Sequence, residues 1–235
     1  IEGGSISEAR IDESGRRILR AKFQMGLFDD PYVDAESAVK TVGREDFVRK
    51  GKEAQRKSIV LLKNTLKADS TGILPLEASV KIYTENIDRQ VAMNYAEVVD
   101  SLEDADVAIL RLQTPWEPRD GNFIESMFHQ GRLDFREAEK SRILEIAASK
   151  PTIICIYLDR PAVIPDIAAA SAGLLGDFGA YDDAVLDIVF GKHAPTAILP
   201  FELPSSMEAV ENQLEDMPYD TEDPLFPFGH GLRYD

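Results

Sequence analysis

Cysteine and histidine are scarce in this chain of 235 residues, which contains one cysteine and three histidines. The single cysteine, Cys155, cannot form an internal disulfide, and its apolar neighbours indicate a small buried core residue rather than a nucleophile. The histidines stand far apart, at His129, His193 and His230, and no paired cysteines accompany them. Because metal sites need ligands at close, regular spacings, the sequence predicts neither a metal site nor a disulfide framework.

Long apolar runs and an excess of basic residues are missing too. No apolar segment approaches the length of a membrane-spanning helix, and 44% hydrophobic with 29% charged residues is ordinary for a globular protein. There are 26 basic residues against 42 acidic ones, so the net charge of −16 would repel phosphate backbones and anionic membranes. We therefore expect a soluble protein with neither nucleic acid nor a membrane as partner.

The amino terminus offers no leader sequence. The chain begins at Ile1 rather than Met, so we expect upstream residues to be missing; the compartment stays open, with the cytoplasm favoured. Residues 7–22 then predict an amphipathic helix with Ser7 as its N-cap and Gly26 beyond its end. The apolar face of this helix has no evident partner in the sequence that follows.

Strands and helices alternate through the rest of the chain. Apolar runs predict strands at 80–84, 95–100, 107–112, 152–158, 173–175 and 198–203. Helical patterns lie at 44–63, 134–150, 164–170 and 180–190. Residues 58–62 fit a strand equally well, and Asp134 is an expected N-cap. This order predicts an α/β fold, a mainly parallel sheet with helices on both faces, and an irregular arm at 218–235.

A long segment without clean periodicity follows the apolar strand at 107–112. Long irregular loops are usually lids or binding segments, and in open α/β sheets ligands bind beyond the carboxyl ends of strands. Aromatic and charged residues alternate in this loop, among them Trp116, Glu117, Arg119, Asp120 and Glu125. Such a mixture suits a sugar, whose C–H faces stack on rings while its hydroxyls need donors and acceptors. The alternative is a packed surface loop with Trp116 in a satellite core.

Two carboxylates, Glu117 and Glu125, share this loop with the tryptophan. An aromatic neighbour can desolvate a carboxyl group and suit it to general acid catalysis. A nucleotide site is a competing possibility, because glycines lie between a strand and a helix in residues 173–179. Their spacing departs from G-x-G-x-x-G, and G-x-S-x-G and P-loop motifs are missing. A tight strand-to-helix turn is the simpler interpretation of these glycines.

Four stretches carry a family likeness in their order along the chain. They are residues 16–32 (RRILRAKFQMGLFDDPY), residues 58–64 (SIVLLKN) followed by 74–76 (LPL), Phe190-Gly191 with Leu199-Pro200 and Pro204, and residues 227–234 (PFGHGLRY). The first resembles the last helix of a (β/α)8-type barrel and its exit, and the others resemble the domain that follows that barrel. Together they are similar to the carboxyl-terminal α/β-sandwich domain of glycoside hydrolase family 3.

The resemblance implies a division of the chain into three parts. Residues 1–32 would be the last helix and exit of an otherwise absent barrel domain, residues 33–57 a linker and lead-in helix, and residues 58–235 the α/β-sandwich domain. Family members are retaining β-glycosidases with an Asp nucleophile on the barrel and a Glu acid/base commonly on a second-domain loop. The missing barrel would therefore be the partner of this domain.

The resemblance also assigns roles to the loop. Glu117 is the candidate acid/base and Glu125 the reserve, while Trp116, Asp120 and Arg119 are candidate contacts to substrate. The substrate would be a terminal β-linked glucose or xylose residue, and no cofactor would be needed. Because retaining chemistry needs two carboxyl groups about 5 Å apart, the isolated chain is expected to be inactive.

The chain departs from the family pattern at two places. Gln113-Thr114 precede Trp116 and Glu117 where the family usually has a G-E pair, and Thr196-Ala-Ile198 stand where it usually has S/T-G-R. Both departures favour the alternative function, a non-catalytic carbohydrate-binding or assembly module of the same fold. Neither the particular sugar nor the oligomeric state can be inferred from the sequence.

Overall fold

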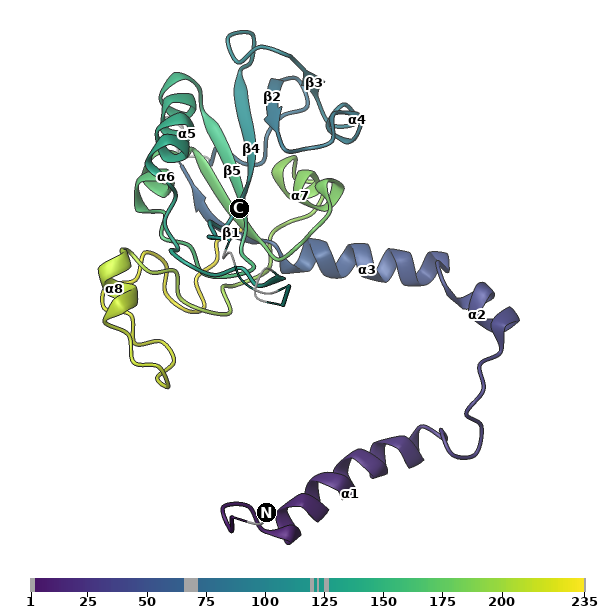
Figure 1. Cartoon of the computed structure of the whole chain (residues 1–235). Coiled ribbons are helices and arrows are strands. Elements are labelled where there is room, and N and C mark those ends of the chain that lie inside the picture. Colours follow the sequence, from purple (N-terminus) through teal and green to yellow (C-terminus); the bar gives the residue numbers. More distant parts are fainter. Residues whose placement is uncertain (1–2, 66–71, 119–120, 122, 125–126, 235) are drawn as a thin grey trace. The chain divides into compact units, whose positions relative to one another are not determined.

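The structure of the chain, a computed structural model, describes residues 3–234 except 66–71, 119–120, 122 and 125–126. The chain divides into two compact units, Ile1–Val48 and Arg49–Asp235. The first unit contains helices α1 (Glu8–Gln24) and α2 (Ala35–Thr41), and α3 (Glu45–Ser58) begins in it and continues into the second (Figure 1). The second unit carries the sheet and the irregular loop that follows residue 113.

Helix α1 forms where the amphipathic pattern predicts it. The Ser7 side chain accepts a hydrogen bond from the Arg10 N–H (3.3 Å), which satisfies one donor of the first turn. Gly26 follows the last turn with a φ of +70°, a conformation that glycine adopts readily. None of the residues of α1 is buried, so apolar side chains such as Ile18 and Phe23 remain exposed.

The second unit is built on one six-stranded sheet. Its strands are β1 (Val60–Asn64), β2 (Lys81–Glu85), β3 (Glu97–Val98), β4 (Val107–Gln113), β5 (Thr152–Tyr157) and β6 (Gly173–Asp177). They lie in the order β1-β6-β5-β4-β2-β3, with β1 antiparallel to β6 and all other neighbours parallel. The remaining helices are α4 (Arg89–Ala92), α5 (Glu137–Ser149), α6 (Pro165–Ala170), α7 (Asp182–Val189) and α8 (Met207–Glu211).

Alternate residues of the central strands pack on opposite faces of the sheet. In β5, Ile153 and Cys155 belong to a core with α7, whereas Ile154 and Ile156 belong to a second core with α5 and α6. This follows from the two-residue period of a strand, and branched isoleucine side chains fill a pleated surface well. Figure 1 shows α5 and α6 on one side of the sheet and α7 on the other. The predicted α/β fold, with a mainly parallel sheet covered on both faces, is confirmed.

The predicted helix at 44–63 and the predicted strand at 95–100 are both shorter in the structure. The helix expected at 44–63 ends at Ser58, and the next residues form β1, which was the alternative left open by the sequence. Burial explains this outcome. Alternate side chains of β1 pack into the cores on the two faces of the sheet, as they do in a strand that is buried on both faces. The strand expected at 95–100 is reduced to Glu97–Val98 at the edge of the sheet.

Residues 198–203 do not form the expected strand. Pro200 has no N–H group to donate to a ladder, so a continuous strand is disfavoured there. Leu199 instead donates a single backbone hydrogen bond to the carbonyl of His230 in the tail (2.8 Å). The described part of the tail at 218–235 contains neither helix nor strand, as predicted for an irregular arm.

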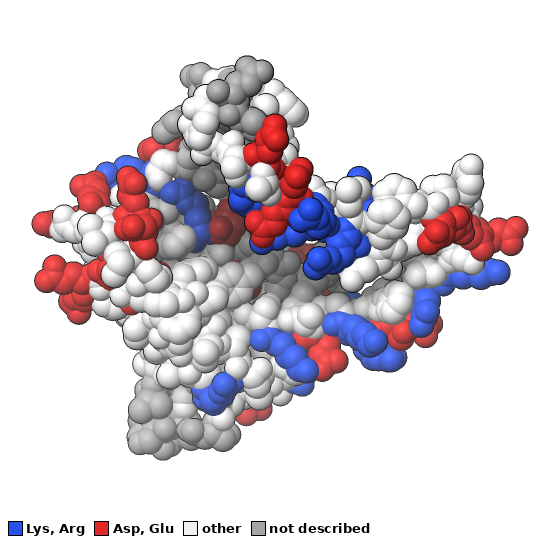
Figure 2. All heavy atoms as spheres, turned by 90° about the horizontal axis from the view of Figure 1, so that it is seen from below, with Lys and Arg blue, Asp and Glu red and all other residues white. Residues whose placement is uncertain are grey.

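The surface of the chain mixes charges of both signs. The face shown in Figure 2 carries Lys and Arg beside Asp and Glu, with broad uncharged areas between them. Acidic side chains on this face are therefore interspersed with basic ones, which is a usual arrangement for a protein in water. Among the helices that the structure describes, none is long and apolar enough to cross a membrane.

Candidate functional site

The order of the strands reverses between β2 and β4. From β2 the chain moves outward to β3 and then returns to the other side of β2, continuing through β4, β5 and β6. Such a switch point leaves a crevice beyond the carboxyl ends of the two strands, where open α/β sheets bind ligands. A cavity of about 780 Å³ lies at this place; its wall includes Asn86 after β2, Gln113 and Trp116 at the end of β4, and Tyr157 at the end of β5.

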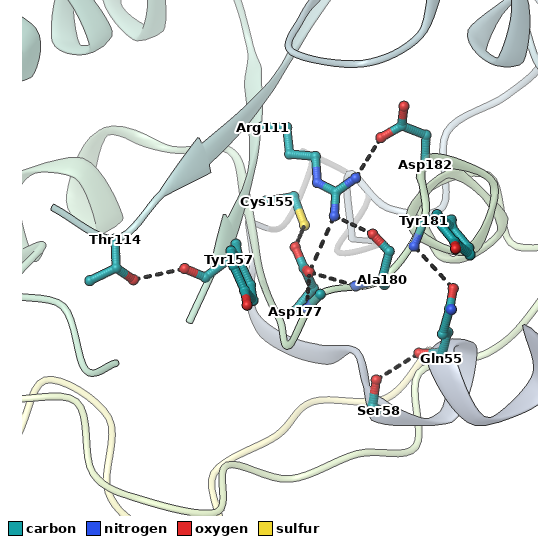
Figure 3. A network of polar contacts seen from close by, with 11 residues as sticks. Gln55, Ser58, Arg111, Thr114, Cys155, Tyr157, Asp177, Ala180, Tyr181 and Asp182 are labelled. Carbon is teal, nitrogen blue, oxygen red and sulfur yellow. Dashed lines mark hydrogen bonds and ion pairs between the residues drawn. The ribbon is translucent and has the colours of Figure 1, made fainter. Parts of the chain in front are cut away.

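The loop leaves β4 through a buried anchor. Thr114 is 1% exposed, and its hydroxyl donates to the carbonyl of Tyr157 (2.7 Å) (Figure 3). The same hydroxyl lies 3.2 Å from the carbonyl oxygen of Arg160. The guanidinium of Arg160 in turn donates to the carbonyl of Gly131 at the far end of the loop (2.6 Å). Both ends of the loop are thus tied to the segment that follows β5.

Trp116 lies between two cavities. Its indole borders the large cavity and a second one of about 260 Å³, and 36% of the residue is exposed. The indole stacks on the imidazole of His129, with ring centroids 4.7 Å apart and an interplanar angle of 14°. The imidazole Nδ1 pairs with the carboxylate of Asp159. Trp116 is thus partly exposed at the wall of both cavities, and its predicted role as a substrate contact stays a prediction.

Glu117 is exposed and lines the smaller cavity together with Trp116, Arg132 and Arg136. Its backbone N–H donates to the carbonyl of Gln130 (2.7 Å), so the loop folds back on itself at this point. A carboxylate at the wall of a cavity can act as a general acid or base toward a bound ligand. The predicted acid/base role of Glu117 stays a prediction.

An ion pair borders the same small cavity. Arg132 holds Asp134 through two hydrogen bonds of 2.8 Å, and this contact lowers the pKa of Asp134. The pKa of Arg132 is raised first by Asp134 and more weakly by Glu117. The N-cap role predicted for Asp134 is wrong, because the carboxylate pairs with Arg132 and α5 begins only at Glu137.

Two shielded donors remain at the base of the loop. Gln130 Nε2 and Arg160 Nη1 are buried and have no hydrogen-bond partner among the residues that the structure describes. Buried N–H groups are rarely left unpaired in folded proteins, so these two atoms are exceptions among the described residues.

The other predicted site residues fall outside the described part of the chain. Arg119, Asp120 and Glu125 lie in the loop at positions that the structure does not describe. Their predicted roles as substrate contacts and reserve acid/base stay predictions. No group of three or more His, Cys, Asp or Glu among the described residues is placed to hold a metal ion.

The glycines after β5 serve packing and a turn. A Cβ on Gly173 would lie 2.9 Å from the Ile153 side chain. The N–H groups of Gly179 and Ala180, which a bound phosphate would need, already donate to the Asp177 carboxylate at 2.9 and 3.0 Å. A side-chain anion therefore occupies the place of a phosphate, and the turn interpretation explains these glycines.

A buried charge network lies beside the large cavity (Figure 3). Arg111 of β4 reaches Asp182 (2.5 Å) and Asp177 (3.3 Å), and also donates to the carbonyl of Ala180. The Cys155 thiol donates to Asp177 (3.2 Å), and burial together with this carboxylate raises the pKa of the thiol. Cys155 is fully buried, so the prediction of a core cysteine is confirmed.

Sequence reasoning missed Arg111 and Asp177 as parts of this site. The one available signal was a lone arginine inside the otherwise apolar run 107–112, because a buried charge requires a partner. The identity of that partner could not be read, since 66 positions separate the two residues. The pairing of His129 with Asp159 was missed for the same reason, at a separation of 30 positions.

Fold and site together define an α/β domain whose carboxyl-end crevice is lined by an aromatic ring, a carboxylate and hydrogen-bonding groups suited to a sugar. The sequence profile of the Glycosyl hydrolase family 3 C-terminal domain matches residues 79–234. The chain therefore belongs to glycoside hydrolase family 3, of which it carries the carboxyl-terminal domain. The resemblance drawn from the sequence is confirmed.

Curated relatives agree with this assignment. The chain is 50% identical over 236 residues to "Probable beta-glucosidase C" of Aspergillus flavus, covering 100% of the chain and 37% of that protein. It is 40% identical over 238 residues to "Periplasmic beta-glucosidase/beta-xylosidase" of Dickeya chrysanthemi, covering 100% of the chain and 36% of that protein. The chain thus spans little more than a third of the length of these relatives.

Solved structures share the fold. The β-glucosidase of Listeria innocua in complex with isofagomine superposes with a TM-score of 0.71 at 22% identity, covering 100% of this chain and 40% of that one. A β-glucosidase from Erythrobacter marinus gives a TM-score of 0.73 at 21% identity, with 99% and 41% coverage. At this identity the likeness concerns the fold.

Proposed function

We propose that this chain is the carboxyl-terminal domain of a retaining β-glycosidase that hydrolyses terminal β-linked glucose or xylose. The observation that carries the proposal is the position of Trp116, which borders both the cavity at the switch point of the sheet and a smaller cavity that Glu117 lines. Relatives named β-glucosidase and β-glucosidase/β-xylosidase support this substrate class. The β-glucosidase of Listeria innocua has been solved with glucose and with laminaribiose, which supports it further.

Each loop residue has a role in this proposal. Glu117 protonates the glycosidic oxygen and then deprotonates the attacking water, and Trp116 stacks on the sugar ring. Asp120 and Arg119 contact sugar hydroxyls, and Glu125 is the reserve acid/base. The nucleophile, an Asp, comes from a barrel domain that precedes this chain. No cofactor takes part, because both steps are proton transfers and displacements between carboxylates, sugar and water.

The domain boundaries belong to the proposal as well. Residues 1–32 are the last helix and exit of the barrel, residues 33–57 the linker and lead-in helix, and residues 58–235 the α/β-sandwich domain. The exposed apolar side chains of α1, including Ile18 and Phe23, support this, because an amphipathic helix normally buries that face. The barrel would supply the surface that covers them.

A substitution at Glu117 in the full-length protein tests the proposal. Glu117→Gln keeps the shape of the side chain but removes the acid/base, so kcat/KM toward an alkyl β-glucoside should fall by about 10²–10⁴-fold. The loss should be smaller for an aryl β-glucoside with an activated leaving group, whose departure needs little protonation. The 235-residue chain alone should show negligible turnover, and turnover by that chain or an unaffected variant would contradict the proposal.

A non-catalytic carbohydrate-binding or assembly module is the second candidate. The sequence Gln113-Thr114 before Trp116, in place of the usual G-E pair, favours this function. A module of this kind would bind a β-glucoside with unchanged affinity after Glu117→Gln and would show no hydrolysis in the full-length protein. Parallel binding and turnover measurements on the full-length protein therefore separate the two functions.

A further inference from the structure

The stacked pair of Trp116 and His129 lies outside the acid/base assignment. Two parallel rings at 4.7 Å leave no room for a ligand between them, so one face of the indole is already occupied. Trp116 nevertheless keeps 36% of its surface exposed and borders both cavities. A sugar can therefore approach only the part of the indole that His129 leaves open.

The imidazole is itself fixed from another part of the chain. Its Nδ1 pairs with Asp159, which follows β5 and has a side chain that is 19% exposed. A hydrogen bond that one ring N–H donates to a carboxylate fixes the orientation of a histidine. The neighbouring Arg160 donates a hydrogen bond to the Gly131 carbonyl (2.6 Å). Two consecutive residues, Asp159 and Arg160, therefore contact the carboxyl-terminal end of the loop.

We propose that His129 and Asp159 are positioning residues that hold the indole of Trp116 as a one-sided platform for the sugar ring. The inference rests on the proposed function, because it assigns Trp116 to the substrate. A ring held in place before binding loses little conformational freedom when the sugar arrives, so affinity is gained without a new contact. Loss of the pair should therefore weaken sugar binding more than it slows the chemical step.

The only tryptophan of the chain provides a direct readout. In the 235-residue chain, Asp159→Ala and His129→Ala should each increase acrylamide quenching of Trp116 fluorescence and lower its anisotropy. Asp159→Glu keeps a carboxylate and should restore part of the wild-type signal. The matched control is Asp100→Asn, which removes a surface ion pair with Arg89 away from the loop. If Asp159→Ala fails to fold by circular dichroism, the isosteric Asp159→Asn takes its place.

Kinetics of the full-length protein complete the test. With p-nitrophenyl β-glucoside, Asp159→Asn should raise KM about 2- to 10-fold, the range expected when an aromatic contact is lost, while kcat changes little. Unchanged quenching of Trp116 in Asp159→Ala or Asp159→Asn would overturn the inference. A fall in kcat with unchanged KM would overturn it as well.

The two proposals fail in different ways. If quenching changes as expected but Trp116→Ala leaves KM unaltered, the indole is held by His129 and Asp159 yet does not contact sugar. That result contradicts the substrate role of Trp116 and overturns the platform assignment with it. If Trp116→Ala raises KM but quenching is insensitive to Asp159, the sugar role stands and the positioning role is wrong.

Discussion

The Glu117 side chain occupies the space that a side chain at Gly131 would need. Its φ is +84°, and a Cβ at this position would lie 2.6 Å from the Glu117 Cβ, closer than two carbon atoms can approach. The loop can therefore fold back on Glu117 only with glycine at this point. The position of the candidate acid/base depends on a residue fourteen positions away in sequence, through sterics alone.

Gly131→Ala should move the candidate acid/base. Two effects act together, about 1–2 kcal/mol of backbone strain at positive φ and displacement of Glu117 by the new methyl group. The control is Gly179→Ala, because Gly179 also has a positive φ (+94°) but a Cβ there would meet only Tyr157 at an ordinary 3.6 Å. We expect Gly131→Ala to lower kcat of the full-length protein and Gly179→Ala to affect stability alone. Equal kinetics for the two variants would contradict this role of Gly131.

Asp177 is the centre of the buried charge network and should contribute strongly to stability. It is fully buried and receives hydrogen bonds from Arg111, Cys155 and two backbone N–H groups. Asp177→Ala removes a buried carboxylate that pairs with the Arg111 guanidinium. The free energy of unfolding, measured by urea titration, should fall by about 3–5 kcal/mol. Asp182→Ala, which removes a partly exposed partner of the same arginine, should cost less. The reverse order would contradict the account of the network.

At the scale of elements, helices α3 and α7 are joined by ion pairs. Lys52 contacts Asp183 (2.6 Å), and Arg56 contacts Asp187 (2.5 Å), which also accepts a hydrogen bond from the Tyr95 hydroxyl (2.7 Å). The hydrogen bond from Lys52 lowers the pKa of Asp183 below its ordinary value. A carboxylate with a lowered folded pKa stabilises the fold above its unfolded pKa, and this contribution is lost as pH falls through the folded pKa.

Lys52→Met should therefore have an effect that depends on pH. Because the pair is partly exposed, the cost at pH 7 should be less than about 1 kcal/mol, and it should shrink below about pH 4 as Asp183 becomes protonated. Urea titrations of wild type and variant across this range measure it. The control is Lys57→Met, which removes an exposed pair with Glu53 within α3 and leaves the contact to α7 intact. A cost for Lys52→Met that is equal at pH 7 and pH 3 would contradict the assignment.

Elements with a strong local signal were predictable from sequence. The strand at 152–158 and the helix at 7–22 were readable because an unbroken isoleucine-rich run and an amphipathic repeat with a serine cap have few alternatives. The start of β1 could not be predicted, since residues 58–62 fit both a helix and a strand. Only their pairing with β6 decides between the two. The missing strand at 198–203 depends on Pro200 and on a tail that lies thirty residues away.

At the scale of the whole molecule, the chain carries one side of a divided catalytic centre in our proposal. Trp116 and Glu117 could be proposed from sequence, because an aromatic and a carboxylate stand next to each other directly after a strand, and the structure places both at the wall of a cavity. The residues that support them could not be predicted, since Asp159 and Arg160 become neighbours of the loop only when the sheet brings β4 and β5 together. Sequence can thus name candidate residues, whereas the contacts that hold them depend on the fold.

Azide rescue of Glu117→Gln in the full-length protein tests the central claim most directly. Azide is a nucleophile that needs no general base, so it should attack the glycosyl-enzyme, restore turnover of an aryl β-glucoside and release a β-glycosyl azide with retained configuration. Glu125→Gln under the same conditions is the control and should yield no azide product. Rescue of Glu125→Gln in place of Glu117→Gln, or the absence of azide product from the Glu117 variant, would contradict the assignment of Glu117.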